Sequence, residues 1–181
     1  MHKFITVSMF ALALTLPAAA QDAAVPAPGA IARFIDANGQ SVGAVTLTQA
    51  ITGVHVSGAL TGMTPGDHGL HFHETGSCDD ATAFESAGGH FNPTEHQHGL
   101  DNPDGPHAGD LPNVTAAADG TTPVELDTNL VSLIDGQPGY VFDADGTALV
   151  IHAGPDDYKT DPAGNSGDRV ACAVIEAAPD A

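Results

Sequence analysis

Glycine and proline interrupt this chain so often that long helices have little room to form. The 21 glycines and 13 prolines separate short segments rich in Val, Ile, Leu and Thr. After the first twenty residues, no window of about eleven residues repeats with the period of an amphipathic helix. We therefore expect an all-β protein. Strands are predicted at residues 30–35, 42–48, 53–60, 68–74, 113–118, 124–128, 139–142, 149–151 and 169–175.

Turns and loops punctuate this pattern. The pairs Asn38-Gly39, Asp119-Gly120 and Asp145-Gly146 are typical of turns between antiparallel strands. Two longer stretches, 75–112 and 153–168, are rich in Gly, Pro, Asn, Asp and His, and loops of such length in a compact domain usually carry function. The pattern predicts one sandwich or barrel domain with two functional loops.

The first twenty residues have the layout of a secretory signal peptide. Lys3 precedes an apolar run from Phe4 to Leu16, and small residues follow as far as Ala20. The run is about thirteen residues long, short of the ~18 to 20 that cross a bilayer, so we expect a cleaved signal and no stable membrane anchor. The predicted organisation is a signal peptide at 1–20, a flexible Ala/Pro leader at 21–29 and one folded domain at 30–181.

Charge and cysteine usage narrow the range of partners. The formal net charge is −19 with four basic residues, which excludes nucleic acid. Such acidity repels anions, so an anionic substrate would need a local positive site. The two cysteines, Cys78 and Cys172, are expected to pair in an exported protein, with two buried free thiols as the alternative.

Histidines are concentrated in one part of the chain. Eight of the ten lie between His68 and His152. His71 and His73 stand two residues apart on a predicted strand, so their rings share a face. A lone His-x-His is a weak signal, but here further histidines and Asp110 accompany it in the first long loop. Imidazole and carboxylate ligands together suit zinc and copper; nitrogen ligands alone suit Cu(II), and three histidines with one aspartate suit zinc.

Six segments resemble, in order and spacing, motifs of the copper/zinc superoxide dismutases of bacterial type. They are GLHFHE (69–74), GHFNP (89–93), HG (98–99), HAGDL (107–111), LVIH (149–152) and GDRVAC (167–172). The resemblance extends from Ala30 onward and implies an eight-stranded antiparallel Greek-key β-barrel, an immunoglobulin-like sandwich with two long functional loops.

The resemblance also implies one copper and one zinc ion per chain. Copper would be bound by His71, His73, His90 and His152, and zinc by His90, His98, His107 and Asp110. His90 would then bind through both ring nitrogens, which requires loss of its second proton, and two cations beside it make that loss possible.

Further roles follow from the same resemblance. His90 and Arg169 would be the catalytic residues, with the guanidinium pairing with superoxide. Asp156 would bridge one copper ligand and one zinc ligand and fix their tautomers, and Cys78 would be bonded to Cys172. Of the other histidines, His68 is expected to be structural, His55 to be exposed, and His96 to be a weaker alternative to His98 at zinc.

The resemblance predicts a periplasmic enzyme that dismutates superoxide, with a non-catalytic copper- and zinc-binding protein of the same fold as the alternative. The second long loop is shorter than in eukaryotic members, and Lys159 is its only basic residue, which puts in doubt the charge pattern that steers superoxide. Eukaryotic dimer contacts cannot be transferred, so a homodimer is one open alternative.

Overall fold

The computed structural model describes residues 28–179, and the expected signal peptide and most of the leader lie outside them. Strand β1 begins at Gly29, the last residue of the expected leader, because Gly29 already pairs with Thr48 of β2. No helix among the described residues is long and apolar enough to span a membrane. The strands are β1 (Gly29–Asp36), β2 (Ser41–Ala50), β3 (Gly53–Leu60), β4 (Gly66–His68), β5 (Leu70–His73), β6 (Val114–Ala116), β7 (Thr122–Thr128), β8 (Ala148–His152) and β9 (Arg169–Ala177), with short 3-10 helices η1 (Asp80–Thr82) and η2 (Glu85–Ala87).

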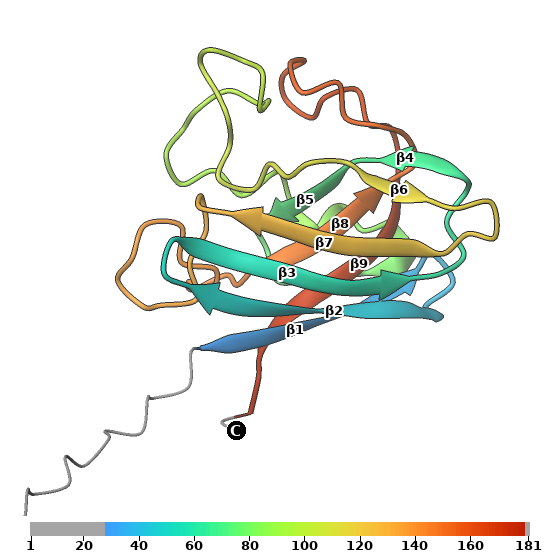
Figure 1. The fold of residues 1–181 in the computed structure, drawn as a ribbon, viewed down its shortest axis with the longest axis horizontal. Helices are drawn as coiled ribbons and strands as arrows, with labels where there is room; N and C mark the ends of the chain where they lie inside the picture. The colour runs from blue at the N-terminus through green and yellow to red at the C-terminus, as the bar shows by residue number, and fades with distance from the viewer. Residues whose placement is uncertain (1–27, 180–181) are drawn as a thin grey trace, which may run out of the picture.

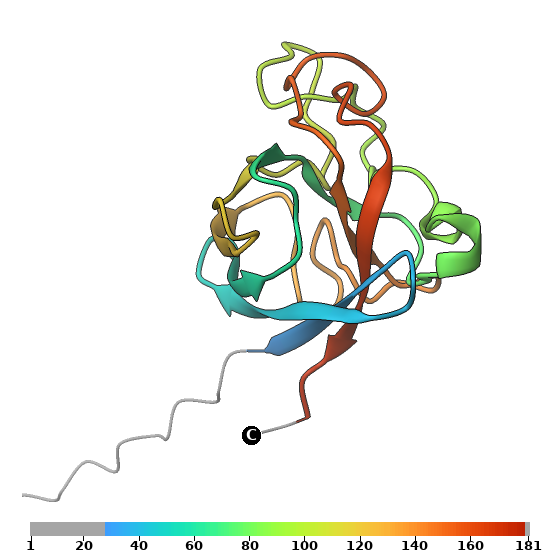
Figure 2. The same cartoon turned by 90° about the vertical axis from the view of Figure 1, so that its right-hand side faces the viewer.

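The strands wrap around one core (Figures 1 and 2). Seven form an antiparallel sheet in the order β5-β8-β9-β1-β2-β3-β7, and β4 pairs with β6. Gly69 alone separates β4 from β5, and a turn joins β6 to β7 through the bond from Ala117 N–H to the Thr121 carbonyl (2.8 Å). Counting β4 and β5 as one interrupted strand gives the expected eight, so the predicted all-β Greek-key barrel is confirmed.

One predicted strand is wrong. Residues 139–142 lie in the loop between β7 and β8, where a single parallel bridge joins Ser132 to Tyr140. Gly139 has a φ of 72°, in the left-handed region. A residue in this conformation interrupts an extended strand. Asp145-Gly146 also joins no strand pair, because the Asp145 carbonyl accepts the Gly76 N–H of the first long loop (2.9 Å). The other two turn pairs lie between strands as expected.

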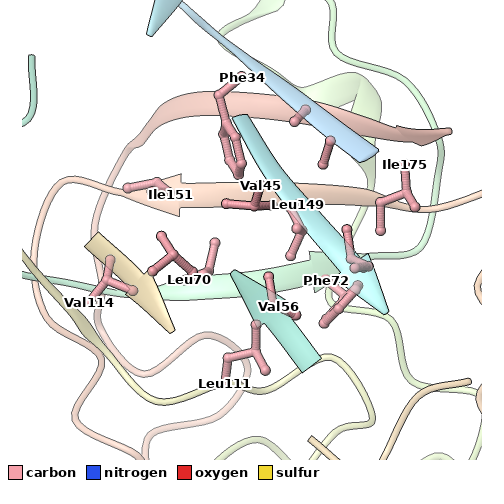
Figure 3. Close-up of a cluster of buried hydrophobic side chains, with 14 of the residues drawn as sticks. Phe34, Val45, Val56, Leu70, Phe72, Leu111, Val114, Leu149, Ile151 and Ile175 are labelled. Carbon is pink, nitrogen blue, oxygen red and sulfur yellow. The ribbon is translucent and has the colours of Figure 1, made fainter. Parts of the chain in front are cut away.

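Alternating side chains of the strands fill the barrel (Figure 3). Phe34, Leu70, Phe72, Leu149 and Ile151 are all fully buried in one cluster. Full burial of such a side chain stabilises the fold by about 1.5 to 3 kcal/mol. This packing fixes β5 and β8, and therefore the histidines that alternate with their core residues.

The second long loop and the part of the first that follows η2 lie together at one side of the barrel, next to the edge formed by β4 and β5 (Figures 1 and 2). Tyr158 of the second loop holds them together, since its carbonyl accepts the Asp101 N–H (3.0 Å) and its hydroxyl accepts the Asn113 N–H (2.7 Å). The expected disulfide is confirmed: Cys78 in the first loop is bonded to Cys172 of β9.

His55 on β3 lies between two carboxylates of β7. Its Nδ1 is 2.9 Å from Asp127 Oδ1 and its Nε2 is 3.1 Å from Glu125 Oε1. The hydrogen bond with Asp127, together with the charge of Glu125, raises the pKa of His55 against the opposing effect of desolvation. The ring is partly exposed and, among the described residues, belongs to no group of side chains that could hold a metal ion.

Removing this ring should change stability only at low pH. A raised histidine pKa stabilises the folded state below the unfolded value of about 6.5, and this contribution disappears as pH rises through the folded value. His55→Gln is therefore expected to lower the melting temperature relative to the wild type at about pH 5.5 and to leave it unchanged at about pH 9. Equal differences at both pH values would contradict the assignment.

Candidate metal centre

Strand β5 presents two histidines on one face. Leu70 and Phe72 point into the core, so His71 and His73 point to the opposite side, towards the long loops. One edge of β5 pairs with β8, and along the other edge Phe72 N–H donates to the Gly109 carbonyl (2.9 Å). The first long loop thereby covers the histidine face, and all four residues of β5 are buried.

His90 and His152 complete a first cluster with His71 and His73. A β-bridge places His90 opposite His73, and His152 ends β8 with its N–H donating to the Gly69 carbonyl (2.9 Å). One nitrogen of each ring lies within 4.8 Å of those of the other three. The nitrogens His71 Nδ1, His73 Nε2, His90 Nε2 and His152 Nε2 are buried and have no hydrogen-bond partner.

The opposite nitrogens fix three of these rings. His71 Nε2 is 2.8 Å from Asp156 Oδ2, His73 Nδ1 is 3.0 Å from the Gly88 carbonyl, and His152 Nδ1 is 2.9 Å from the Gly167 carbonyl. A ring that donates from one nitrogen to an oxygen turns the lone pair of the other nitrogen into the cluster.

The charge state of the rings suits metal binding. Burial lowers the pKa of His71 to about 3 and that of His152 to about 4, so both rings are neutral at physiological pH. An unpartnered buried polar group costs about 1 to 3 kcal/mol. Four such nitrogens with free lone pairs fit an ion that prefers nitrogen ligands, as Cu(II) does.

A second cluster joins His90 to His98, His107 and Asp110. Asp110 Oδ1 is 3.0 Å from both His90 Nδ1 and His98 Nδ1, and 3.5 Å from His107 Nδ1. Asp110 Oδ2 accepts the backbone N–H groups of Gly99 (2.8 Å) and His107 (3.0 Å). Burial raises the pKa of Asp110, but these contacts outweigh burial and hold it far below its usual range. Three imidazoles around one carboxylate are a typical donor set for zinc.

His90 belongs to both clusters. Its Nδ1 faces Asp110, and its Nε2 is one of the unpartnered nitrogens of the first cluster. The ring centroids of His90 and His71 are 4.0 Å apart, so the clusters adjoin. The structure thus brings all seven predicted ligand residues together in two sets of four that overlap at this ring.

Asp156 forms a second connection between the clusters. Its Oδ2 lies 2.8 Å from His71 Nε2, and its Oδ1 lies 3.0 Å from His98 Nε2. Burial raises the pKa of Asp156, but the two histidines and the Tyr158 N–H lower it by more, so this buried carboxylate is ionised. The same contacts act on His98: burial lowers its pKa, while Asp110 and Asp156 raise it to about 9.

Sequence reasoning missed the groups that hold Asp156. Asn113 fixes its backbone, donating through Nδ2 to the Asp156 carbonyl (2.9 Å) and accepting the Asp156 N–H at Oδ1 (2.8 Å). At Gly164, which has a φ of 61°, a Cβ would lie 1.8 Å from Asp156 Oδ1. Only glycine allows this close approach, and neither residue belongs to a spacing pattern that indicates its role.

The other histidines of the long-loop region lie outside both clusters. His96 is exposed, and its backbone is hydrogen-bonded to the side chain of Asn92. His68 is buried, with its Nδ1 2.7 Å from the His152 carbonyl and its Nε2 2.7 Å from the Thr64 carbonyl. This arrangement supports the barrel end, as a structural histidine would.

Arg169 lies beside the first cluster as the cross-strand partner of His152. Its Nη1 donates to the Phe84 carbonyl and its Nη2 to the Gly88 carbonyl, both at 2.6 Å. The Gly88 carbonyl also accepts a hydrogen bond from His73 Nδ1. One backbone carbonyl therefore orients both a ring of the cluster and the guanidinium next to it. Arg169 is half-buried and keeps further N–H groups for a ligand.

An antiparallel β-barrel with two histidine clusters that share one ring defines a binuclear metalloprotein. Residues 41–175 match the family described as copper/zinc superoxide dismutase. The chain belongs to this family, whose cofactors, copper and zinc, fit the donor sets of the two clusters.

Curated relatives agree with this assignment. A Cu-Zn superoxide dismutase of Caulobacter vibrioides is 49% identical over 142 residues, covering 77% of this chain and 80% of its own. Superoxide dismutase [Cu-Zn] 1 of Aquifex aeolicus is 44% identical over 146 residues, covering 80% of this chain and 86% of its own.

Solved structures share the fold. A superoxide dismutase-like protein from Bacillus subtilis aligns with a TM-score of 0.76 at 39% identity, covering 80% of this chain and 97% of its own. The Cu/Zn superoxide dismutase from Brucella abortus aligns with a TM-score of 0.66 at 30% identity, covering 82% of this chain and 99% of its own.

Proposed function

We propose that the protein is an enzyme that dismutates superoxide: two superoxide anions and two protons give one oxygen molecule and one hydrogen peroxide. The observation that carries this proposal is the set of four unpartnered, buried histidine nitrogens next to Arg169. Copper bound there by His71, His73, His90 and His152 would supply the one-electron redox chemistry, whereas zinc bound by His90, His98, His107 and Asp110 has none.

The chain itself supplies a proton site and an anion site. His90 is the one ring that belongs to both four-residue clusters of the described residues, and its Nε2 has no protein partner, so this nitrogen is the proposed site at which the ring takes up a proton and releases it. Arg169 provides a permanent positive charge beside His152, held rigidly by two carbonyls, that can pair with an anionic oxygen species. His90 and Arg169 are therefore the proposed catalytic residues.

Asp156 is the proposed positioning residue. By accepting from His71 and His98 it fixes one ring of each metal site in the tautomer that directs the other nitrogen towards the metal.

A metal-binding protein without turnover is the second reading. A protein described only as superoxide dismutase-like shares this fold, so the fold alone does not distinguish an enzyme from a metal-binding protein without turnover. The complete copper donor set together with Arg169 favours the enzyme.

Processing and location remain proposals that rest on the sequence. A signal peptide at 1–20, a leader at 21–29 and a domain at 30–181 would deliver the protein to the periplasm. Relatives include an extracellular superoxide dismutase of Haemonchus contortus, 37% identical over 142 residues, which is compatible with a place outside the cytoplasm. A homodimer is likewise a prediction.

The function is tested on purified protein loaded with copper and zinc. Metal analysis should find about one of each per chain. Superoxide should be consumed by the loaded protein and not by the zinc-only protein, because zinc has no redox chemistry. Full metal content with no consumption of superoxide would support the metal-binding reading instead.

Replacing Arg169 should separate substrate recognition from metal binding. Arg169→Ile is expected to retain both metals and to lose on the order of 10- to 100-fold in rate, the worth of a hydrogen bond to a charged group. Arg169→Lys keeps the positive charge but lacks the planar, two-pronged guanidinium, so its rate should lie between those of the wild type and Arg169→Ile. An unchanged rate in Arg169→Ile at full metal content would refute the role.

A further inference from the structure

Acidic side chains surround the hollow beside Arg169. The hollow has a volume of about 730 Å³ and is formed by the start of β9, the turn between β1 and β2, and the first long loop. Its charged lining residues are Arg169 and three acids: Asp36, Glu85 and Asp168. A single guanidinium therefore shares this space with three carboxylates.

The hollow adjoins the first histidine cluster. Arg169 on β9 is the cross-strand partner of His152 on β8. Gly167 also lines the hollow, and its carbonyl accepts a hydrogen bond from His152 Nδ1 (2.9 Å). The hollow therefore shares Arg169 and Gly167 with the immediate surroundings of His152.

Little positive charge opposes these acids. The chain carries a formal charge of −19 with four basic residues, and two divalent metal ions would leave it strongly anionic. Arg33 is already paired with Glu176 at 3.0 Å. Asp36 accepts the N–H groups of Asn38 and Gln40, which lower its pKa and keep it ionised.

Glu85 is the acid most directly associated with Arg169. It begins η2, between Phe84 and Gly88, whose carbonyls hold the guanidinium. Burial lowers the pKa of Arg169, and the charge of Glu85 offsets part of this effect, so the carboxylate acts on the guanidinium electrostatically. The side chain is exposed and, among residues 28–179, makes no ion pair that would neutralise it.

We propose that Glu85 slows the approach of superoxide to Arg169 and the copper site, so that this protein works against a local repulsion of its own substrate. The proposal rests on the proposed function. Like charges lower the local concentration of an anion in a cleft, and salt weakens the effect once the Debye length falls to ~10 Å or less.

The test measures the second-order rate constant against ionic strength for the loaded wild type and its variants. The wild-type rate is expected to rise with salt. Glu85→Gln should raise the rate roughly two- to fivefold at low ionic strength, with a smaller gain at high salt, and Glu85→Lys should raise it further and reverse the salt dependence.

Asp135→Asn is the matched control. It removes the same charge from an exposed residue. Its neighbours Ile134 and Gln137 line a different hollow, with Gln49 and Gly53. That hollow lies at the far end of β2, on the order of 30 Å from the turn between β1 and β2.

A second measurement needs no turnover. Azide, a monovalent anion that coordinates Cu(II), is titrated into the loaded proteins and followed by visible absorption. Its Kd should fall roughly two- to fivefold in Glu85→Gln at low ionic strength and stay at the wild-type value in Asp135→Asn.

The outcomes separate the two proposals. Tighter azide binding in Glu85→Gln without superoxide turnover in any variant would sink the proposed function and leave the repulsion by Glu85 standing. An active protein whose rate and azide affinity are the same in wild type and Glu85→Gln overturns the inference. Equal gains in Glu85→Gln and Asp135→Asn also overturn it, because net charge and not Glu85 would then be the cause.

Discussion

Replacing His90 by alanine is expected to empty both metal sites and to abolish dismutation. His90 Nδ1 faces Asp110, while Nε2 points into the first cluster. Loss of a residue that only orients a ligand costs ~10- to 100-fold in metal affinity, so loss of a shared ligand should cost at least about 100-fold at each site. Metal analysis after dialysis against a weak chelator measures the effect.

His96→Ala is the matched control, because His96 is exposed, lies two residues before His98 and belongs to neither cluster. It should retain both metals and full activity. Retention of copper and zinc by His90→Ala would show that the ring is not shared, and loss of zinc from His96→Ala would mean that His96 is a ligand.

Removal of the disulfide is expected to produce the largest loss of stability. Cys78 and Cys172 are 94 residues apart, and the chain-entropy model assigns about 4 to 5 kcal/mol to closing a loop of about that length. The double variant Cys78→Ser/Cys172→Ser should therefore unfold at a lower urea concentration than the wild type. The first long loop, which carries four of the proposed metal ligands, should also become easier to cleave by protease.

A reductant provides the internal control. It should destabilise the wild type towards the level of the double variant and leave the double variant unchanged. Equal unfolding midpoints of oxidised wild type and double variant would mean that strain in the native state or residual structure in the unfolded chain cancels the expected gain.

The two histidines of β5 show what periodicity alone can predict. Alternation on a strand places His71 and His73 on one face, because Leu70 and Phe72 need the other. The same rule fails at residues 139–142: Val141 is fully buried there, but the left-handed Gly139 prevents pairing with a neighbouring strand.

Loop residues could be grouped only through the family resemblance. His98, His107 and Asp110 meet because backbone bonds, such as that from Phe72 N–H to the Gly109 carbonyl, fold the first loop back on β5. Residue spacing does not encode such bonds. The Gly88 carbonyl accepts hydrogen bonds from both His73 and Arg169. This role could not be predicted from the residue type, because every residue has a backbone carbonyl.

The double connection between the clusters, through the ring of His90 and the carboxylate of Asp156, has a thermodynamic consequence. At the proposed sites, an ion in either one would restrain groups that the other also uses, so filling one would lower the ordering cost of filling the other. Linkage requires reciprocity: the factor by which zinc raises the affinity for copper equals the factor by which copper raises the affinity for zinc. Metallation of this barrel would then be cooperative, with the affinity of each site depending on whether the other is filled.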